Sequence, residues 1–183
     1  MSDAAPRRAV FFDRDGTLNH VVLRDGEPCP PADSSETVLM PGAAEALGRL
    51  KAEGLLLIVA TNQPDVAKGL TTRENVEAIN RWLAARLPID HFEVCWCLEG
   101  EHCKCYKPRP GMLLEAAARM DIRLDESFMV GDRWRDIGAG KAAGCFTIWL
   151  QNDYDRPRES PDRTVRSLAE AADVILQRCR KVS

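Results

Sequence analysis

Residues 9–18 read Ala-Val-Phe-Phe-Asp-Arg-Asp-Gly-Thr-Leu, and this stretch decides how the rest of the chain is interpreted. Its first four residues are a continuous apolar run, which is typical of a strand buried on both faces of a parallel sheet. The run ends at two carboxylates, Asp13 and Asp15, followed by Gly16. Taken alone, Asp-x-Asp-Gly fits a solvated turn or a calcium loop as well as a reactive site. Its meaning therefore depends on what the other strands carry.

Short apolar strands alternate with helical segments along the remaining chain. The spacing predicts strands over 55–60, 92–96, 128–130 and 145–150. It predicts helices over 42–53, 72–86, 110–120, 135–143 and from about 167 to the end. The helix over 72–86 is expected to have Thr71 as its N-cap, and Ser167 with Glu170 is expected to form a capping box. This alternation predicts an α/β fold with a parallel sheet covered by helices on both faces.

Length and composition exclude several classes of protein. With 183 residues, 45% of them hydrophobic and 29% charged, we expect a single globular domain spanning 1–183. A net charge of -3 argues against a nucleic-acid partner. No apolar run approaches the roughly 20 residues that cross a bilayer, and the first residues lack a signal-peptide core. We expect a monomeric cytoplasmic protein without a membrane partner.

Polar residues with complementary chemistry follow several of the predicted strands. Phosphoryl transfer requires a nucleophile, a proton donor for the leaving oxygen, a hard cation and donors for the phosphoryl oxygens. Asp13 suits the nucleophile and Asp15 the general acid and base. Thr61 and Lys107 suit the phosphoryl oxygens, and Asp132 could hold Mg²⁺ together with Asp13.

The order of these motifs resembles that of the haloacid dehalogenase superfamily of phosphohydrolases. The similarity runs from about Val10 to Leu150. A second Asp two residues after the nucleophile, as Asp15 follows Asp13, is similar to the pattern of the phosphatase branch rather than that of the dehalogenase branch. The resemblance implies a three-layer Rossmann-like fold and the roles just described. It also implies that the backbone carbonyl of Asp15 joins the Mg²⁺ shell and that Asp136 is a supporting carboxylate.

Four cysteines lie close together just before Lys107. Cys95-Trp96-Cys97 and Cys103-Lys104-Cys105 are two Cys-x-Cys pairs, and His102 adjoins the second pair. Four thiolates can complete a closed tetrahedral zinc site. The alternative is a buried strand pair with unrelated loop thiols. A structural zinc would stiffen the loop that delivers the motif lysine.

This cysteine loop resembles that of the small, capless group of histidinol-phosphate and heptose-bisphosphate phosphatases. That group typically has Cys-x-His where this chain has Cys95-Trp96-Cys97, so the expected ligands are Cys95, Cys97, Cys103 and Cys105, with His102 as the alternative to Cys97. The group tends to have Arg where this chain has Tyr106, and Ser-Gly where this chain has Pro64-Asp65.

These features together predict a Mg²⁺-dependent phosphomonoester hydrolase that acts through an aspartyl-phosphate on a small phosphorylated metabolite. The resemblance implies a sugar bisphosphate such as D-glycero-D-manno-heptose 1,7-bisphosphate as the leading substrate, and Asn62, Tyr106 and Arg133 are the expected substrate contacts. The alternatives are histidinol phosphate, a polynucleotide end, or a non-enzymatic zinc module. The segment 156–166 carries charges of both signs and is expected to be a solvated connection.

Overall fold

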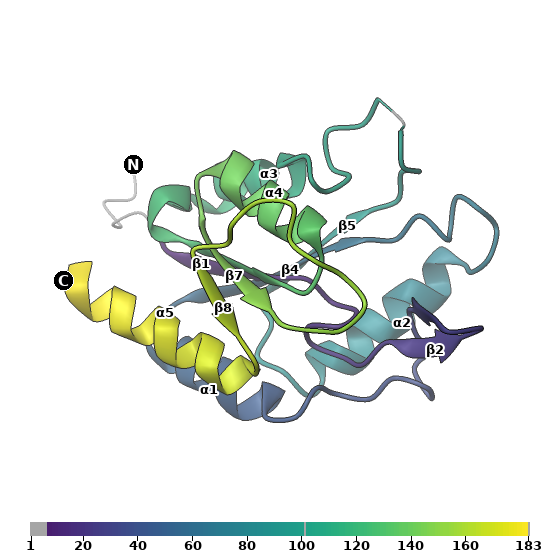
Figure 1. The fold of residues 1–183 in the computed structure, drawn as a ribbon, viewed down its shortest axis with the longest axis horizontal. Helices are drawn as coiled ribbons and strands as arrows, with labels where there is room; N and C mark the ends of the chain where they lie inside the picture. The colour runs from purple at the N-terminus through teal and green to yellow at the C-terminus, as the bar shows by residue number, and fades with distance from the viewer. Residues whose placement is uncertain (1–6, 101, 183) are drawn as a thin grey trace.

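A six-stranded sheet lies at the centre of the computed structural model, which describes residues 7–100 and 102–182 (Figure 1). In spatial order its strands are β5 (His91–Cys95), β4 (Leu56–Asn62), β1 (Ala9–Phe12), β6 (Phe128–Gly131), β7 (Phe146–Leu150) and β8 (Arg163–Val165). Every neighbouring pair is parallel. Phe12 lies between Val59 of β4 and Val130 of β6. The carboxyl end of β1 is therefore near the middle of the sheet.

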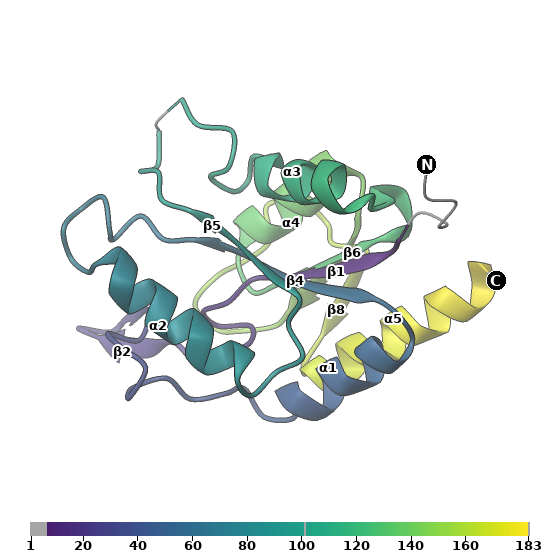
Figure 2. The same cartoon turned by 180° about the vertical axis from the view of Figure 1, so that it is seen from behind.

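Helices cover both faces of this sheet, as predicted. The helices α1 (Ala43–Ala52), α2 (Arg73–Ala84) and α5 (Leu168–Val182) contribute to the core on one face. The opposite face is covered by α3 (Gly111–Met120), and Figure 2 shows α4 (Trp134–Ala143) on the same side. Among the described residues, no helix combines the length and apolar character needed to traverse a lipid bilayer.

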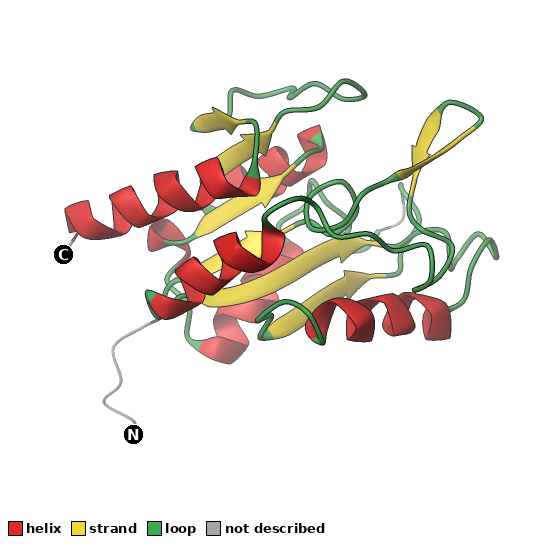
Figure 3. Cartoon of the chain, turned by 90° about the horizontal axis from the view of Figure 1, so that it is seen from below, coloured by secondary structure: helices red, strands yellow, loops and turns green. Residues whose placement is uncertain are grey.

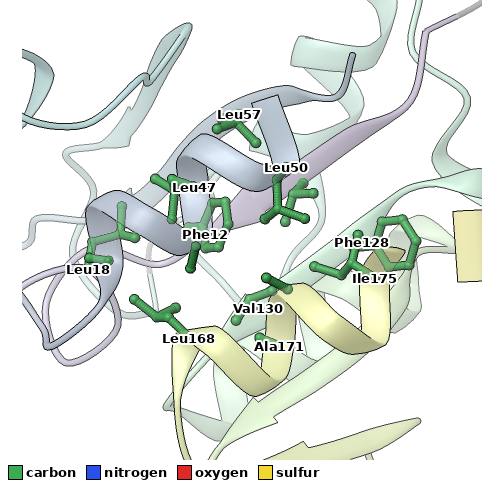
Figure 4. Close-up of a cluster of buried hydrophobic side chains, with 14 of the residues drawn as sticks. Phe12, Leu18, Leu47, Leu50, Leu57, Phe128, Val130, Leu168, Ala171 and Ile175 are labelled. Carbon is green, nitrogen blue, oxygen red and sulfur yellow. The ribbon is translucent and has the colours of Figure 1, made fainter. Parts of the chain in front are cut away.

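The two cores follow directly from the alternation of side chains along β1. Val10 and Phe12 point into the core beneath α1 and α5, whereas Ala9 and Phe11 point into the core beneath α3. Figure 4 shows Phe12 among the leucines of α1 and the apolar face of α5. Both phenylalanines are essentially inaccessible to solvent, and burying each side chain stabilises the fold by about 2 kcal/mol. The continuous apolar run before Asp13 is thus explained by burial on both faces.

The prediction that residues 156–166 form a solvated connection is wrong for residues 163–165, which form the strand β8. Residues Arg163–Val165 pair in parallel with β7 and complete the sheet edge. Only Val165 of this strand is buried, so its sequence lacks the apolar run that marks the other strands. A short edge strand of this kind gives too little pattern to be recognised.

A hairpin was also missed within the long irregular stretch that follows the first motif. The strands β2 (Val22–Arg24) and β3 (Glu27–Cys29) are antiparallel and project beyond the sheet (Figure 3). Asp25 and Gly26 join them with φ values of 54° and 82°. Asp-Gly is the usual dipeptide where a two-residue hairpin turn requires positive φ at both positions. The signal was present in the sequence.

Helix caps differ from the predictions by one residue. Thr72, and not Thr71, caps α2, because its hydroxyl accepts a hydrogen bond of 3.2 Å from the Asn75 N–H. At α5 the Ser167 hydroxyl accepts from the Glu170 N–H at 3.1 Å, as predicted. The Glu170 carboxylate accepts a hydrogen bond from the Arg166 N–H, whereas a capping box would have the Ser167 N–H as the donor.

Candidate active site and cysteine cluster

The predicted site residues converge at the carboxyl ends of the central strands. Asp13 directly follows β1, Thr61 and Asn62 are the last residues of β4, and Asp132 directly follows β6. The Asp13 N–H donates to the Val130 carbonyl at 3.0 Å, which holds the first motif against β6. Parallel strands bring their carboxyl ends to one edge, where α/β folds place their ligands. A cavity of about 200 Å³ opens at this edge.

Lys107 joins the acidic residues from the loop between β5 and α3. Its ammonium lies 2.8 Å from Asp13, 2.5 Å from Asp136 and 2.7 Å from the Ala60 carbonyl. The side chain is almost completely buried. Burial alone would lower the pKa of Lys107, but Asp13 and Asp136 outweigh it and raise the pKa above its usual value. Lys107 is therefore a fixed positive charge beside Asp13.

Asn62 holds the backbone of Lys107 with both ends of its amide. Its Nδ2 donates to the Lys107 carbonyl at 3.2 Å, and its Oδ1 accepts from the Lys107 N–H at 3.0 Å. Asn62 also lines the cavity, where it was predicted to contact substrate. Its paired amide indicates that it positions Lys107.

Three buried carboxylates form a group that could hold a cation. Oxygen atoms of Asp13, Asp132 and Asp136 all lie within 4.8 Å of one another. Asp132 accepts hydrogen bonds from the Thr17 hydroxyl at 2.9 Å and the Tyr154 hydroxyl at 2.6 Å. An all-oxygen donor set of this charge fits a hard divalent ion such as Mg²⁺.

The titration of these carboxylates reflects an excess of negative charge. Burial, followed by the charges of Asp13 and Asp136, raises the pKa of Asp132 well above its usual value. Burial also raises the pKa of Asp136 to about 6, although Lys107 opposes the shift. Both shifts show that three ionised carboxylates are not balanced by one ammonium. A divalent cation would relieve this imbalance.

Gly16 makes room for the candidate metal-binding group of Asp13, Asp132 and Asp136. Its φ of +92° lies in the left-handed region. A Cβ at this position would collide with Asp132 and lie 2.5 Å from the Tyr154 hydroxyl oxygen. Glycine is required here by both conformation and space.

Asp15 is held in its ionised form by a buried network. The fully buried Arg14 donates to its carboxylate at 3.1 and 2.8 Å, and Asn19 and Gln63 add bonds of 3.0 and 2.9 Å. Burial raises the pKa of Asp15, but the charge of Arg14 and these hydrogen bonds outweigh it and lower the pKa. Asn80 of α2 accepts from the other side of Arg14 at 3.1 Å.

The four clustered cysteines meet in space. Their Sγ atoms all lie within 4.8 Å of one another, with Cys105 at 3.6 Å from Cys97 and 3.8 Å from Cys103. Zn–S bonds of about 2.3 Å in a tetrahedron place sulfur atoms about 3.8 Å apart, which matches these two distances. Cys95 and Cys105 are joined as a disulfide in this structure, so zinc binding requires that this bond be reduced to two thiolates. His102 is exposed and is not part of the group.

The chemistry of Cys103 also favours a metal ligand. Desolvation raises the pKa of its thiol, but hydrogen bonds from Cys97 and the backbone, with the charge of Arg109, lower the pKa below its usual value. A lowered thiol pKa favours the thiolate, which is the form that binds metals.

The cysteine cluster is attached to the carboxyl edge of the sheet, where the candidate site lies. Cys95 is paired in register with Asn62, and its carbonyl accepts from the Gln63 N–H at 2.7 Å. Cys105 precedes Lys107 by two residues. A rearrangement of the cluster would therefore shift both Lys107 and Asn62, which holds the backbone of Lys107.

Comparison with known proteins agrees with this arrangement. The family profile described as haloacid dehalogenase-like hydrolase matches residues 31–144. This chain belongs to the haloacid dehalogenase-like hydrolase family. The predicted superfamily and the predicted enzyme class, a phosphatase, are both confirmed.

Relatives within the family carry a specific name. The D-glycero-β-D-manno-heptose-1,7-bisphosphate 7-phosphatase of Pasteurella multocida is 35% identical over 150 residues, which cover 75% of this chain and 77% of the relative. The protein of the same name from Escherichia coli K12 is 33% identical over 153 residues, covering 76% of each chain. A solved D,D-heptose 1,7-bisphosphate phosphatase from B. bronchiseptica, complexed with magnesium and phosphate, superposes with a TM-score of 0.81 and 29% identity. That match covers 93% of this chain and 98% of the solved chain.

Several residues that the structure brings to this haloacid dehalogenase-like site were not identified from the sequence. Arg14 lies between two recognised carboxylates, and Gln63 follows the recognised Thr61-Asn62 pair, so proximity to a motif was the available signal. Tyr154 reaches Asp132 from a loop after β7, and nothing in its sequence neighbourhood indicates this. Arg135 lines the cavity beside the predicted Tyr106 and Arg133.

Proposed function

We propose that this protein is a Mg²⁺-dependent phosphomonoester hydrolase that removes the 7-phosphate of D-glycero-β-D-manno-heptose 1,7-bisphosphate. The observation that carries the proposal is the contact of the Lys107 ammonium with Asp13 in a cavity at the carboxyl edge of the sheet. The named activity of relatives at 33–35% identity supports the choice of substrate.

In the first half of the reaction, an Asp13 oxygen attacks phosphorus and forms an aspartyl-phosphate as the sugar oxygen leaves. Asp15 supplies the proton to that oxygen. Lys107 and Thr61 donate to the phosphoryl oxygens, and the hydrogen bond from the Lys107 ammonium orients the Asp13 carboxylate for attack. Both side chains line the same cavity as Asp13.

In the second half, Asp15 removes a proton from water as the water attacks phosphorus and releases Asp13. The hydrogen bonds from Arg14, Asn19 and Gln63 favour the ionised form of Asp15, which is the form needed for this step. The two halves therefore require opposite protonation states of one carboxyl group.

Asp13 and Asp132 would hold Mg²⁺, together with the backbone carbonyl of Asp15, and Asp136 would support the site. When bound, Mg²⁺ neutralises charge on the transferring phosphoryl group. Asp136 also fixes the α4 end of the site, because its carboxylate accepts from the Arg133 N–H at 2.8 Å and from Lys107. Cys95, Cys97, Cys103 and Cys105 would bind a structural Zn²⁺.

Substrate contacts are assigned to further residues that line the cavity. Tyr106 and Arg133 line it together with Val21 and Pro28 next to and within the β2–β3 hairpin. We further propose that residues 1–183 act as one monomeric phosphatase domain in the cytoplasm, with the cysteine loop over about 95–105 as an insertion.

A substrate panel with the intact protein tests this function. The protein would be assayed with Mg²⁺ against heptose 1,7-bisphosphate, histidinol phosphate and a 3′-phosphorylated oligonucleotide. We expect kcat/KM for the bisphosphate to exceed the others by at least about 100-fold. A preference for histidinol phosphate or for the oligonucleotide would contradict the substrate assignment. No release of phosphate from any of them would contradict the proposed activity.

A further inference from the structure

Arg135 is a cation of the cavity that the reaction described above does not use. It lies in the first turn of α4 and lines the cavity together with Asp13 and Lys107. About a quarter of its side chain is exposed. We infer that Arg135 binds the distal phosphate of a bisphosphate substrate and thereby selects bisphosphates over monophosphates. This inference rests on the proposed function.

Aromatic rings hold the Arg135 guanidinium in place. It lies 4.8 Å from the centroid of the Trp134 ring and 6.0 Å from that of Tyr106. Arg158 stacks on Trp134 at 3.6 Å. A guanidinium supported by rings loses less conformational freedom when it binds an anion than a free side chain does.

The donors of Arg135 are only partly used. One terminal nitrogen pairs with Glu99 of the cysteine loop. Its Nε is buried and has no hydrogen-bond partner in the described part of the chain. An unpaired buried donor is costly, and an anionic oxygen that reached it would remove this cost. Guanidinium forks suit phosphate because they can donate two parallel hydrogen bonds.

The other two cations of the cavity are more fully committed. Lys107 contacts Asp13 and Asp136, and in the proposed reaction it binds the phosphoryl group that is transferred. Arg133 stacks on Tyr154 at 4.7 Å, donates to the Pro28 carbonyl at 3.4 Å and lies 3.8 Å from Asp132. Arg133 is therefore attached to the hairpin and the metal-binding group. Arg135 is the cation that remains for a second phosphate.

A comparison of two substrates on variants of the intact protein tests the inference. The substrates are D-glycero-D-manno-heptose 1,7-bisphosphate and the matching 7-phosphate, which lacks the distal group. We expect Arg135→Ala to lower kcat/KM for the bisphosphate by about 10- to 100-fold, chiefly through KM, and to change the value for the 7-phosphate by less than about threefold. Arg135→Lys should fall between, because it keeps the charge and loses the planar fork.

Arg158→Ala is the matched control. It removes the same charge from a second arginine on the Trp134 ring, outside the residues that line the cavity, and should leave both substrates within about threefold of wild type. Equal losses for both substrates in Arg135→Ala, or no loss for either, would overturn the inference while leaving the proposed function intact. If the wild type hydrolyses neither substrate, the proposed function itself fails.

Discussion

Removal of Mg²⁺ should make the stability of this protein fall as the pH rises from about 4 to about 6. In the metal-free protein, burial and the charge of Asp13 raise the pKa of Asp136 from 3.8 to about 6, against the opposing effect of Lys107. This rise corresponds to about 3 kcal/mol. Between these pH values the folded state binds the proton more tightly than the unfolded chain, so the free energy of unfolding decreases as the pH increases.

Asp132 should add to the same loss, since its pKa is also raised by burial and by the neighbouring carboxylates. Asp15 acts in the opposite direction, because its pKa is lowered. Its stabilising contribution is complete above its unfolded-state pKa and disappears only as the pH falls through the lower folded-state value. It therefore does not mask the loss between pH 4 and pH 6.

The assay is urea unfolding, followed by tryptophan fluorescence at several pH values with chelator or with Mg²⁺. We expect Mg²⁺ to increase the free energy of unfolding more at pH 7.5 than at pH 5. Asp132→Asn is the control, because the Thr17 and Tyr154 hydroxyls can rotate to bond an amide. This variant should be more stable than wild type in chelator at pH 7.5 and should gain little from Mg²⁺. A metal-free stability that rises between pH 4.5 and 6.5, or an equal Mg²⁺ effect at all pH values, would refute the reasoning.

Four further substitutions test the supporting structure. The wild type should contain about one Zn²⁺ per chain by elemental analysis. Cys103→Ser should lower both the zinc content and the melting temperature. Loss of zinc in His102→Ala would contradict the all-cysteine ligand set. Asn62→Ala should lower kcat more than it raises KM, because it releases the backbone of the motif lysine, and a pure KM effect would instead indicate a substrate contact. Gly16→Ala should abolish the Mg²⁺-dependent gain in unfolding free energy, since its Cβ would displace a metal-binding carboxylate; an unchanged gain would show that the turn can adapt.

The sheet could be predicted because its central strands carry their own signal. Residues 9–12 and 55–60 are apolar on both faces, and each ends where polar residues begin. β8 could not be predicted, since an edge strand with one buried side chain has no periodic pattern. The β2–β3 hairpin is a different case, because Asp25-Gly26 indicated the turn but each flanking strand has only three residues and Pro28 interrupts the second.

The site shows the same division. Asp13, Thr61 and Asp132 are recognisable because each lies at a strand end within a motif, and Lys107 is recognisable because it stands between the cysteine pairs and Pro108. Their supporting partners depend on tertiary structure: Tyr154 reaches Asp132 across 22 residues. Spacing along the chain indicates which residues share an edge of the sheet, and it does not indicate which side chains complete the hydrogen bonds of each site residue.

The central claim is that Asp13 attacks the substrate phosphate, and the rate of Asp13→Asn with heptose 1,7-bisphosphate and Mg²⁺ tests it most directly. The amide is nearly the same size and can still accept a hydrogen bond from Lys107, so the variant should fold with a normal zinc content. Because an amide cannot form the aspartyl-phosphate, we expect kcat to fall by roughly 10⁴-fold or more. Turnover close to the wild-type rate in a variant of confirmed sequence would contradict the account.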